Sequence, residues 1–133
     1  MVSHPWRELR HLPHIRVSYV DMPAPWCAMT NGVDLIWMDK HLYQVERRVH
    51  LQHELEHIKR GHRGHQPPAI ELGVRITTAH KLITFEDLMK ARAWSGHNYT
   101  EMADELWVTP EVLFDRINYL KGEERRAFDA FDD

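Results

Sequence analysis

Cysteine is almost absent from the chain: Cys27 is the only one among 133 residues, so no internal disulfide can form. Such usage is typical of a reducing compartment. Excess charge is also lacking, because a net charge of −3 gives no electrostatic case for nucleic acid or an anionic membrane. No apolar run approaches the roughly 20 residues of a membrane span, and residues 1–12 lack the apolar core of a signal peptide. We therefore expect one cytoplasmic, globular domain over 1–133.

Histidine, by contrast, is abundant, with 11 copies, and two of them belong to the array His53-Glu54-Leu55-Glu56-His57. The surrounding segment, 45–60, has the length and composition of a helix, on which residues four apart lie on one face. His53 and His57 would then supply half of a tetrahedral zinc site. Glu54 projects about 100° round the helix from His53, beside the metal without being a ligand. This pattern is typical of zinc hydrolases.

Chance alone could produce the array, since a chain with 11 His and 11 Glu yields H-E-x-x-H in roughly 7% of shuffled sequences. The surrounding residues argue against chance. Apolar residues continue the stripe of the two histidines, and a second apolar row occupies the opposite face. The first row comprises Leu42, Val45 and Val49, and the second comprises Leu51, Leu55 and Ile58. A helix with two apolar faces is buried on both sides, so the histidines face the interior of the protein.

The region before this helix predicts a small sheet, so that the fold class is α+β. A short helix is expected first, from Trp6 to Leu12, followed by an alternating strand over 15–20. Asn31-Gly32 is the strongest hairpin signal in the chain and is flanked by two apolar segments. Region 6–38 is therefore predicted to form a three-stranded antiparallel sheet.

Helices are expected to follow the sheet. Asp39 is predicted to cap the central helix, 39–61, which carries the H-E-x-x-H array. Capping residues and prolines then predict a helical part over 69–121, with Gly122 as the stop of its last helix. The charged tail, 122–133, is expected to be partly disordered.

A catalytic zinc site needs a third protein ligand and one position left open. Glu71 would open the next helix after the connection 58–70, which is long enough to bring its carboxylate over the two histidines. His62 and His65 lie in the Gly-rich bend after the first helix, from which either could fold back. Spacing favours Glu71 but leaves five candidates open: Glu71, His62, His65, His50 and His80.

The segment 44–62 resembles the active-site helix of ImmA/IrrE-type metallopeptidases, small zinc proteases of bacteria, phages and mobile elements. Glu46-Arg47-Arg48 and Arg60-Gly61-His62 flank the array as they do in the actinobacterial and actinophage branch of that family. Further matches occur in the same order along the chain. They are Leu12-Pro13, Asn31-Gly32, Ile36-Trp37-Met38-Asp39, Lys81-Leu82-Ile83 and 103–108. The resemblance thus covers most of 6–120.

The resemblance implies a minimal zincin-like fold and a Zn²⁺ ion held by His53, His57 and Glu71. Glu71-Leu72-Gly73-Val74 stands at the position of the family's third-ligand element, ahead of a Leu-Ile pair. This element departs from the family pattern at Arg75, where relatives usually have Asp or Asn. Gly73 is a second weak point, because glycine destabilises a helix interior.

A site of this kind implies a peptidase in which Glu54 acts as general base and then passes the proton to the leaving amine. The oxyanion stabiliser stays open among Tyr43, His80 and His62. The edge of the sheet, with 33–38 as the candidate strand, is expected to hold an extended substrate. The family's association with helix-turn-helix repressors implies a protein substrate of that class, from a phage or mobile element.

Two alternatives stay open. The zinc site could serve a non-hydrolytic antirepressor or another protein-interaction module, although purely structural zinc has no use for Glu54. Region 100–116 has the rhythm of a DNA-binding helix-turn-helix, but Glu111 and Asp115 leave its second helix little positive charge for phosphates. We expect no direct contact with nucleic acid, and interpret this region as a helical pair packed into the core, with Trp107 as an anchor.

Overall fold

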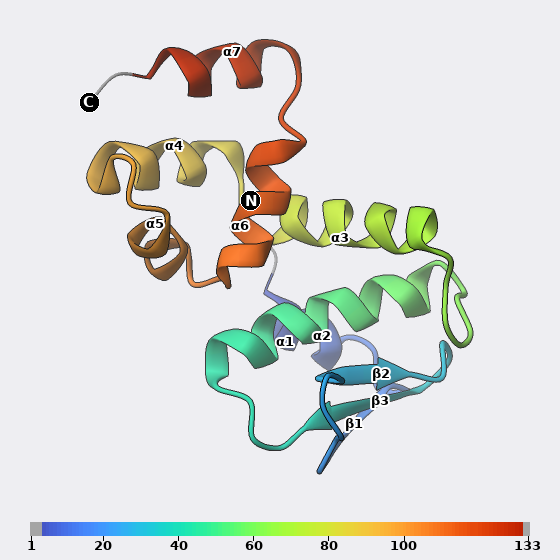
Figure 1. Cartoon of the computed structure of the whole chain (residues 1–133). Helices are drawn as coiled ribbons and strands as arrows, with labels where there is room; N and C mark the ends of the chain where they lie inside the picture. The colour runs from blue at the N-terminus through green and yellow to red at the C-terminus, as the bar shows by residue number, and fades with distance from the viewer. Residues whose placement is uncertain (1–3, 132–133) are drawn as a thin grey trace.

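The structure, a computed structural model, describes residues 4–131. Its central helix, α2 (Gln44–Lys59), lies between a small three-stranded sheet and a group of helices formed by the second half of the chain (Figure 1). This layering confirms the α+β class and explains why α2 has two apolar faces. One face packs Leu51 and Leu55 against Ile36 of the sheet, and the opposite face packs Val49 into the helical cluster.

The sheet is mixed, which corrects the prediction of a purely antiparallel one. Its strand order is β1-β3-β2, with β1 (Arg16–Val20) parallel to β3 (Leu35–Asp39) and β2 (Ala28–Thr30) antiparallel to β3. The connection between β1 and β2 spans residues 21–27. It contains Pro23 and Pro25, which have no N–H to donate to a hairpin ladder. β1 and β2 are not paired with each other, and β3 lies between them.

The hairpin between β2 and β3 forms at the predicted turn, although its loop is longer than expected. Oδ1 of Asn31 accepts hydrogen bonds from the backbone N–H groups of Val33, Asp34 and Leu35, at 2.9, 3.0 and 3.1 Å. These bonds close a loop over 31–34. Val33 therefore belongs to the turn and not to the strand in which the sequence placed it.

Gly32 makes the close contact between this hairpin and the loop that follows α2. Its φ is +80°, and a Cβ added there would lie 2.0 Å from the carbonyl oxygen of His62. We expect Gly32→Ala to lower the free energy of unfolding by about 3 kcal/mol, through left-handed backbone strain and this clash. Urea denaturation measures the loss. Val33→Ala, at an exposed position of the same turn, should change stability by less than about 0.5 kcal/mol; equal losses in both variants would contradict the role given to Gly32.

α2 begins later than predicted, because Asp39 is not its cap. The backbone of Asp39 is used by the sheet: it ends β3, and its N–H donates to the carbonyl oxygen of Cys27 at 2.8 Å. The N-cap is Tyr43, whose N–H donates to Oε1 of Glu46 at 3.0 Å. The helix ends near the predicted position, with Gly61 at φ +72° after the last turn.

The helical half of the chain follows the predicted order. Its elements are α3 (Pro68–Leu82), α4 (Phe85–Ser95), α5 (Tyr99–Leu106), α6 (Pro110–Asn118) and α7 (Gly122–Ala130), and a short α1 (Pro5–Arg10) precedes the sheet. α7 corrects the prediction of a partly disordered tail that begins at Gly122; residues 132 and 133 lie outside the described range. Phe128 of α7 is buried in the helical cluster. Arg125 pairs with Asp129 one turn further on, at 3.2 Å.

Trp107 is not the core anchor that the sequence predicted. It ends α5 in the left-handed conformation, with φ 56°, and the residue is 52% exposed. Leu113 of α6 is fully buried in its place. Arg48 of α2 ties this end of α5 to the central helix, because its Nη1 donates to the carbonyl oxygen of Trp107 at 2.6 Å. Between residues 4 and 131, no helix has both the length and the apolar character that crossing a membrane requires.

Candidate metal centre

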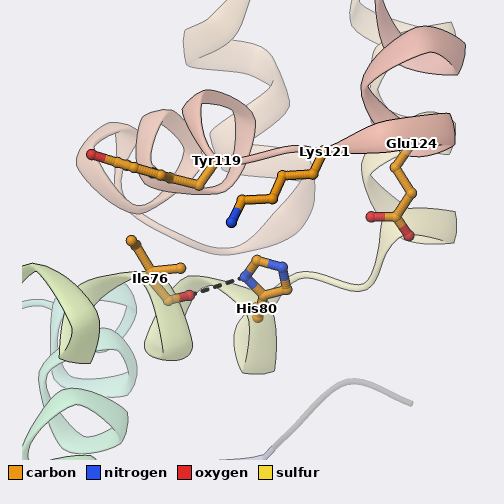
Figure 2. Close-up of a pocket in the computed structure, with 5 residues that line it drawn as sticks. All are labelled: Ile76, His80, Tyr119, Lys121 and Glu124. Atoms are coloured by element: carbon orange, nitrogen blue, oxygen red, sulfur yellow. Dashed lines mark hydrogen bonds between the residues drawn. The ribbon is translucent and has the colours of Figure 1, made fainter.

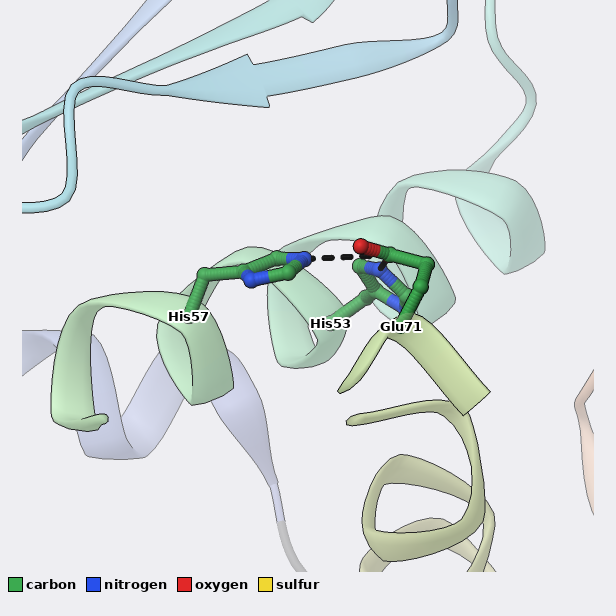
Figure 3. A group of neighbouring side chains, drawn as sticks. All are labelled: His53, His57 and Glu71. Carbon is green, nitrogen blue, oxygen red and sulfur yellow. Dashed lines mark hydrogen bonds and ion pairs between the residues drawn. The ribbon is translucent and has the colours of Figure 1, made fainter. Parts of the chain in front are cut away.

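The three residues named as metal ligands lie together where the first turn of α3 meets α2. Figure 3 shows His53 and His57 on one side of α2, with the Glu71 carboxylate reaching them from α3. Oε1 of Glu71 is 2.6 Å from Nε2 of His53 and 3.1 Å from Nε2 of His57. The centroids of the two imidazole rings are 4.9 Å apart. Spacing left five candidates for the third ligand. Among them, Glu71 is the one that lies against Nε2 of both His53 and His57.

The donor atoms suit a single zinc ion. Tetrahedral zinc with bonds near 2.1 Å separates its ligand atoms by about 3.4 Å. The donor atoms of His53, His57 and Glu71 all lie within 4.8 Å of one another. Two imidazole nitrogens and a carboxylate oxygen are also a donor set that zinc takes in hydrolases. Small rotations of these side chains would therefore bring the three donor atoms to bonding distance of one zinc ion.

Polar contacts farther along the two helices hold α3 on α2. The buried Glu56 of α2 forms an ion pair with Lys81 of α3. Nη2 of Arg60 donates to Oγ1 of Thr77 at 2.6 Å. A Cβ added at Gly73 would lie 3.4 Å from Nη1 of Arg60, an ordinary contact distance. The glycine that weakened the sequence prediction thus lies where the arginine side chain crosses α3.

Arg75, the departure from the family pattern, connects α3 to α6 and not to the metal ligands. Its Nε and Nη2 donate to the two carboxylate oxygens of Asp115, at 3.2 and 2.6 Å. Asp115 is buried, so this bidentate pair is partly shielded from water. Arg75 therefore helps to fix the position of α3, the helix that carries Glu71.

One side of the centre is open to solvent. The side chain of His57 is 9% exposed, that of His53 19% and that of Glu71 34%. Within the described part of the chain, no fourth His, Cys, Asp or Glu joins this group. A structural zinc site is closed by four protein ligands, whereas a catalytic one keeps a position free. The donor count and the exposure both fit a catalytic centre.

Glu54 is buried beside the ligand pair, and its carboxyl group has no hydrogen-bond or ion-pair partner among residues 4–131. Burial, together with the negative charge of Glu71, raises the pKa of Glu54 to about 8. A largely buried carboxyl group whose pKa is displaced by burial and by a nearby charge is characteristic of functional sites. Glu54 is thus free to interact with a water molecule or substrate at the centre.

The charges of the ligand groups also suit metal binding. Burial lowers the pKa of His53, and its bond to Glu71 offsets only part of this effect. Burial acts in the opposite direction on Glu71, but bonds from His53 and His57 outweigh it and hold the pKa of the carboxyl group below its usual value. At neutral pH the centre therefore presents a neutral imidazole at His53 and a carboxylate at Glu71, the states in which these groups bind metals.

The other histidines named from the sequence do not join the donor set. His62 contacts His57, but on the opposite side of that ring: the two Nδ1 atoms are 3.0 Å apart. His65 is exposed in the loop between α2 and α3. His50 lies about one turn before His53 on α2, outside the group of converging donor atoms. The contact of His62 was missed because spacing could not show which face of His57 the loop approaches.

Two of the three candidate oxyanion stabilisers lie far from the centre. Tyr43 is 81% exposed at the start of α2, about 15 Å along the helix from His53. His80 lines a pocket of about 190 Å³ between α3 and the start of α7, shown in Figure 2 with Lys121 and Glu124. Its Nδ1 donates to the carbonyl oxygen of Ile76 at 3.1 Å. This pocket shares no residue with the metal centre.

A second group of donors, Asp21, Asp39 and His41, lies on the surface near the ends of β1 and β3. Asp21 is far from Asp39 and His41 in the chain, so local spacing did not indicate this group. Asp21 already pairs with Lys40 at 3.2 Å and with His41 at 2.6 Å. Exposed ion pairs account for this group without a metal.

No protein-family model matches the chain, and no curated protein or solved structure is significantly similar to it. The ImmA/IrrE resemblance therefore rests on the residues quoted above. The case for a function depends on the geometry of the centre.

Proposed function

We propose that the protein is a zinc-dependent metallopeptidase that cleaves a peptide bond in a protein substrate. The observation that carries this proposal is the position of the Glu71 carboxylate against Nε2 of both His53 and His57. The buried and unpaired Glu54 beside them supports hydrolysis over a purely structural zinc site.

Each residue has a separate role in this proposal. His53, His57 and Glu71 would hold the ion, which supplies Lewis-acid activation of water and of the scissile carbonyl group. In its ionised form, which the positive charge of a bound ion would favour, Glu54 would accept a proton from the attacking water and give it to the nitrogen of the leaving amine. The side chain of His57 is little exposed, so water has little access to that side of the centre. Glu71 is more exposed, so a substrate can approach from its side.

An extended substrate could pair with the edge strand β2. The sequence had suggested residues 33–38 for this role. β3 is paired on both sides, so residues 33–38 cannot accept a further strand. β2 is an edge strand and contacts α2 (Figure 1). The carbonyl oxygen of Cys27 and the N–H of Asn31 bond to β3, so the alternate backbone groups of Ala28 and Thr30 point outward. A peptide added there would lie beside the helix that carries the H-E-x-x-H array.

The substrate class is the most specific part of the proposal. The ImmA/IrrE resemblance favours a helix-turn-helix repressor from a phage or mobile element. A non-hydrolytic antirepressor would use the same partner and the same zinc site, so the two functions differ in whether a bond is cleaved.

Peptide hydrolysis tests the proposal directly. Tag-free protein loaded with one equivalent of zinc is incubated with a mixture of unstructured peptides, and new termini are identified by mass spectrometry. We expect cleavage that stops when a chelator removes zinc and returns when zinc is restored. Absence of cleavage, together with zinc-dependent binding of a repressor, would replace the peptidase by the antirepressor.

A further inference from the structure

His62 has a specific relation to the metal centre, although it is not one of the three converging ligands. Its Nδ1 lies 3.0 Å from Nδ1 of His57, whereas Nε2 of His57 faces Glu71 at 3.1 Å. The two ring nitrogens of His57 thus face two different partners. His62 therefore contacts the side of His57 that points away from the metal position.

The chemistry of imidazole determines what this contact can do. A neutral histidine ring carries one hydrogen, so His57 must hold it on Nδ1 in order to present the lone pair of Nε2 to a metal. That N–H needs an acceptor, because His57 is buried. Nδ1 of His62 is placed to accept it, provided that His62 carries its own hydrogen on Nε2. Metal ligands are commonly oriented by such a partner, usually a carboxylate or a carbonyl group.

The backbone holds His62 in this position from two directions. Its N–H donates to the carbonyl oxygen of His57 at 2.9 Å, at the end of α2. On the other side, its carbonyl oxygen lies against Gly32 so closely that a Cβ there would be 2.0 Å away. The turn of the β2–β3 hairpin therefore packs against His62. Only glycine fits at position 32, because any Cβ there would clash with the backbone of His62.

We propose that His62 is a positioning residue: it accepts the Nδ1–H of His57 and thereby fixes the ring orientation and tautomer in which His57 binds zinc. This inference rests on the proposed zinc site but not on hydrolysis. It assigns a role to the Arg60-Gly61-His62 motif, which the ligand set leaves without one.

A matched pair of variants isolates the hydrogen bond from the packing. Asn and Leu have nearly the same shape, and Oδ1 of Asn occupies the place of Nδ1 in His. We expect His62→Leu to weaken zinc binding by about 10- to 100-fold, and His62→Asn to stay within about 3-fold of the unmodified protein. Zinc affinity is measured by competition with a chromophoric chelator. His65→Leu, in the same loop but exposed, should leave the affinity unchanged.

A spectroscopic measurement on the unmodified, zinc-loaded protein gives an independent readout. In a ¹⁵N-labelled sample, we expect His57 to be protonated at Nδ1 and to show scalar coupling between its Nδ1 and that of His62 across the hydrogen bond. Equal zinc affinities for the Leu and Asn variants, or a missing coupling in a protein that binds zinc, would overturn the role of His62 and leave the zinc site standing. If the unmodified protein binds no zinc at all, the proposed function itself fails.

Discussion

Glu54→Gln is expected to abolish peptide hydrolysis, with a loss of at least about 1,000-fold in kcat/KM, while one zinc ion per chain stays bound. The amide keeps the shape of the carboxyl group but cannot accept a proton from water or pass it to the leaving amine. His53, His57 and Glu71 are unchanged, so the donor set proposed to hold the ion is intact. Cleavage of a mapped peptide, followed together with native mass spectrometry, measures both properties on one sample.

The substitution should leave the fold intact, which makes the result interpretable. Burial raises the pKa of Glu54 to about 8, so the metal-free protein at pH 7 already holds this carboxyl group mainly in its neutral form. Gln resembles that form in size and charge. Glu101→Gln, at an exposed position of α5, provides a control of the same chemical change and should retain full activity. Undiminished turnover in Glu54→Gln would mean that another group acts as the base.

The grouping of His53, His57 and Glu71 was predictable because its elements are local. His53 and His57 share a face by helical spacing alone, and Glu71 follows after a connection short enough to return to that face. The sequence could also predict the hairpin, since Asn31 caps its own turn through three backbone N–H groups. In each case the information lies within about 20 residues of chain.

The errors arose where distant segments decide the structure. The parallel pairing of β1 with β3 joins two strands that β2 separates in the chain, and no local pattern records such a pairing. α7 was mistaken for a tail because its charged residues outnumber its apolar ones, yet burial of Phe128 in a cluster built by other helices suffices to fix it. The contact of His62 with His57 likewise depends on the hairpin turn at Gly32, about 30 residues earlier in the chain.

Glu71→Gln is expected to remove most of the zinc affinity, by at least about 100-fold, without unfolding the protein. The neutral amide oxygen is a much poorer zinc ligand than a carboxylate, and the two histidines alone complete only half of a tetrahedral site. The side chain is 34% exposed and makes no contribution to either hydrophobic cluster, so its replacement disturbs the packing of α2 and α3 little.

Thermal or urea unfolding with and without zinc measures the difference in zinc affinity between the unmodified protein and Glu71→Gln as a difference in stability. Zinc present at 100 times its dissociation constant should stabilise the unmodified protein by about 2.7 kcal/mol, because only the folded state presents the complete donor set. Glu71→Gln should show almost none of this increment at the same zinc concentration, whereas His65→Leu should show all of it. An undiminished increment in Glu71→Gln would keep the metal but exclude Glu71 as a ligand. The third donor would then have to come from the loop after α2, and His62, which already contacts His57, would change from a positioning residue to the leading candidate for that ligand.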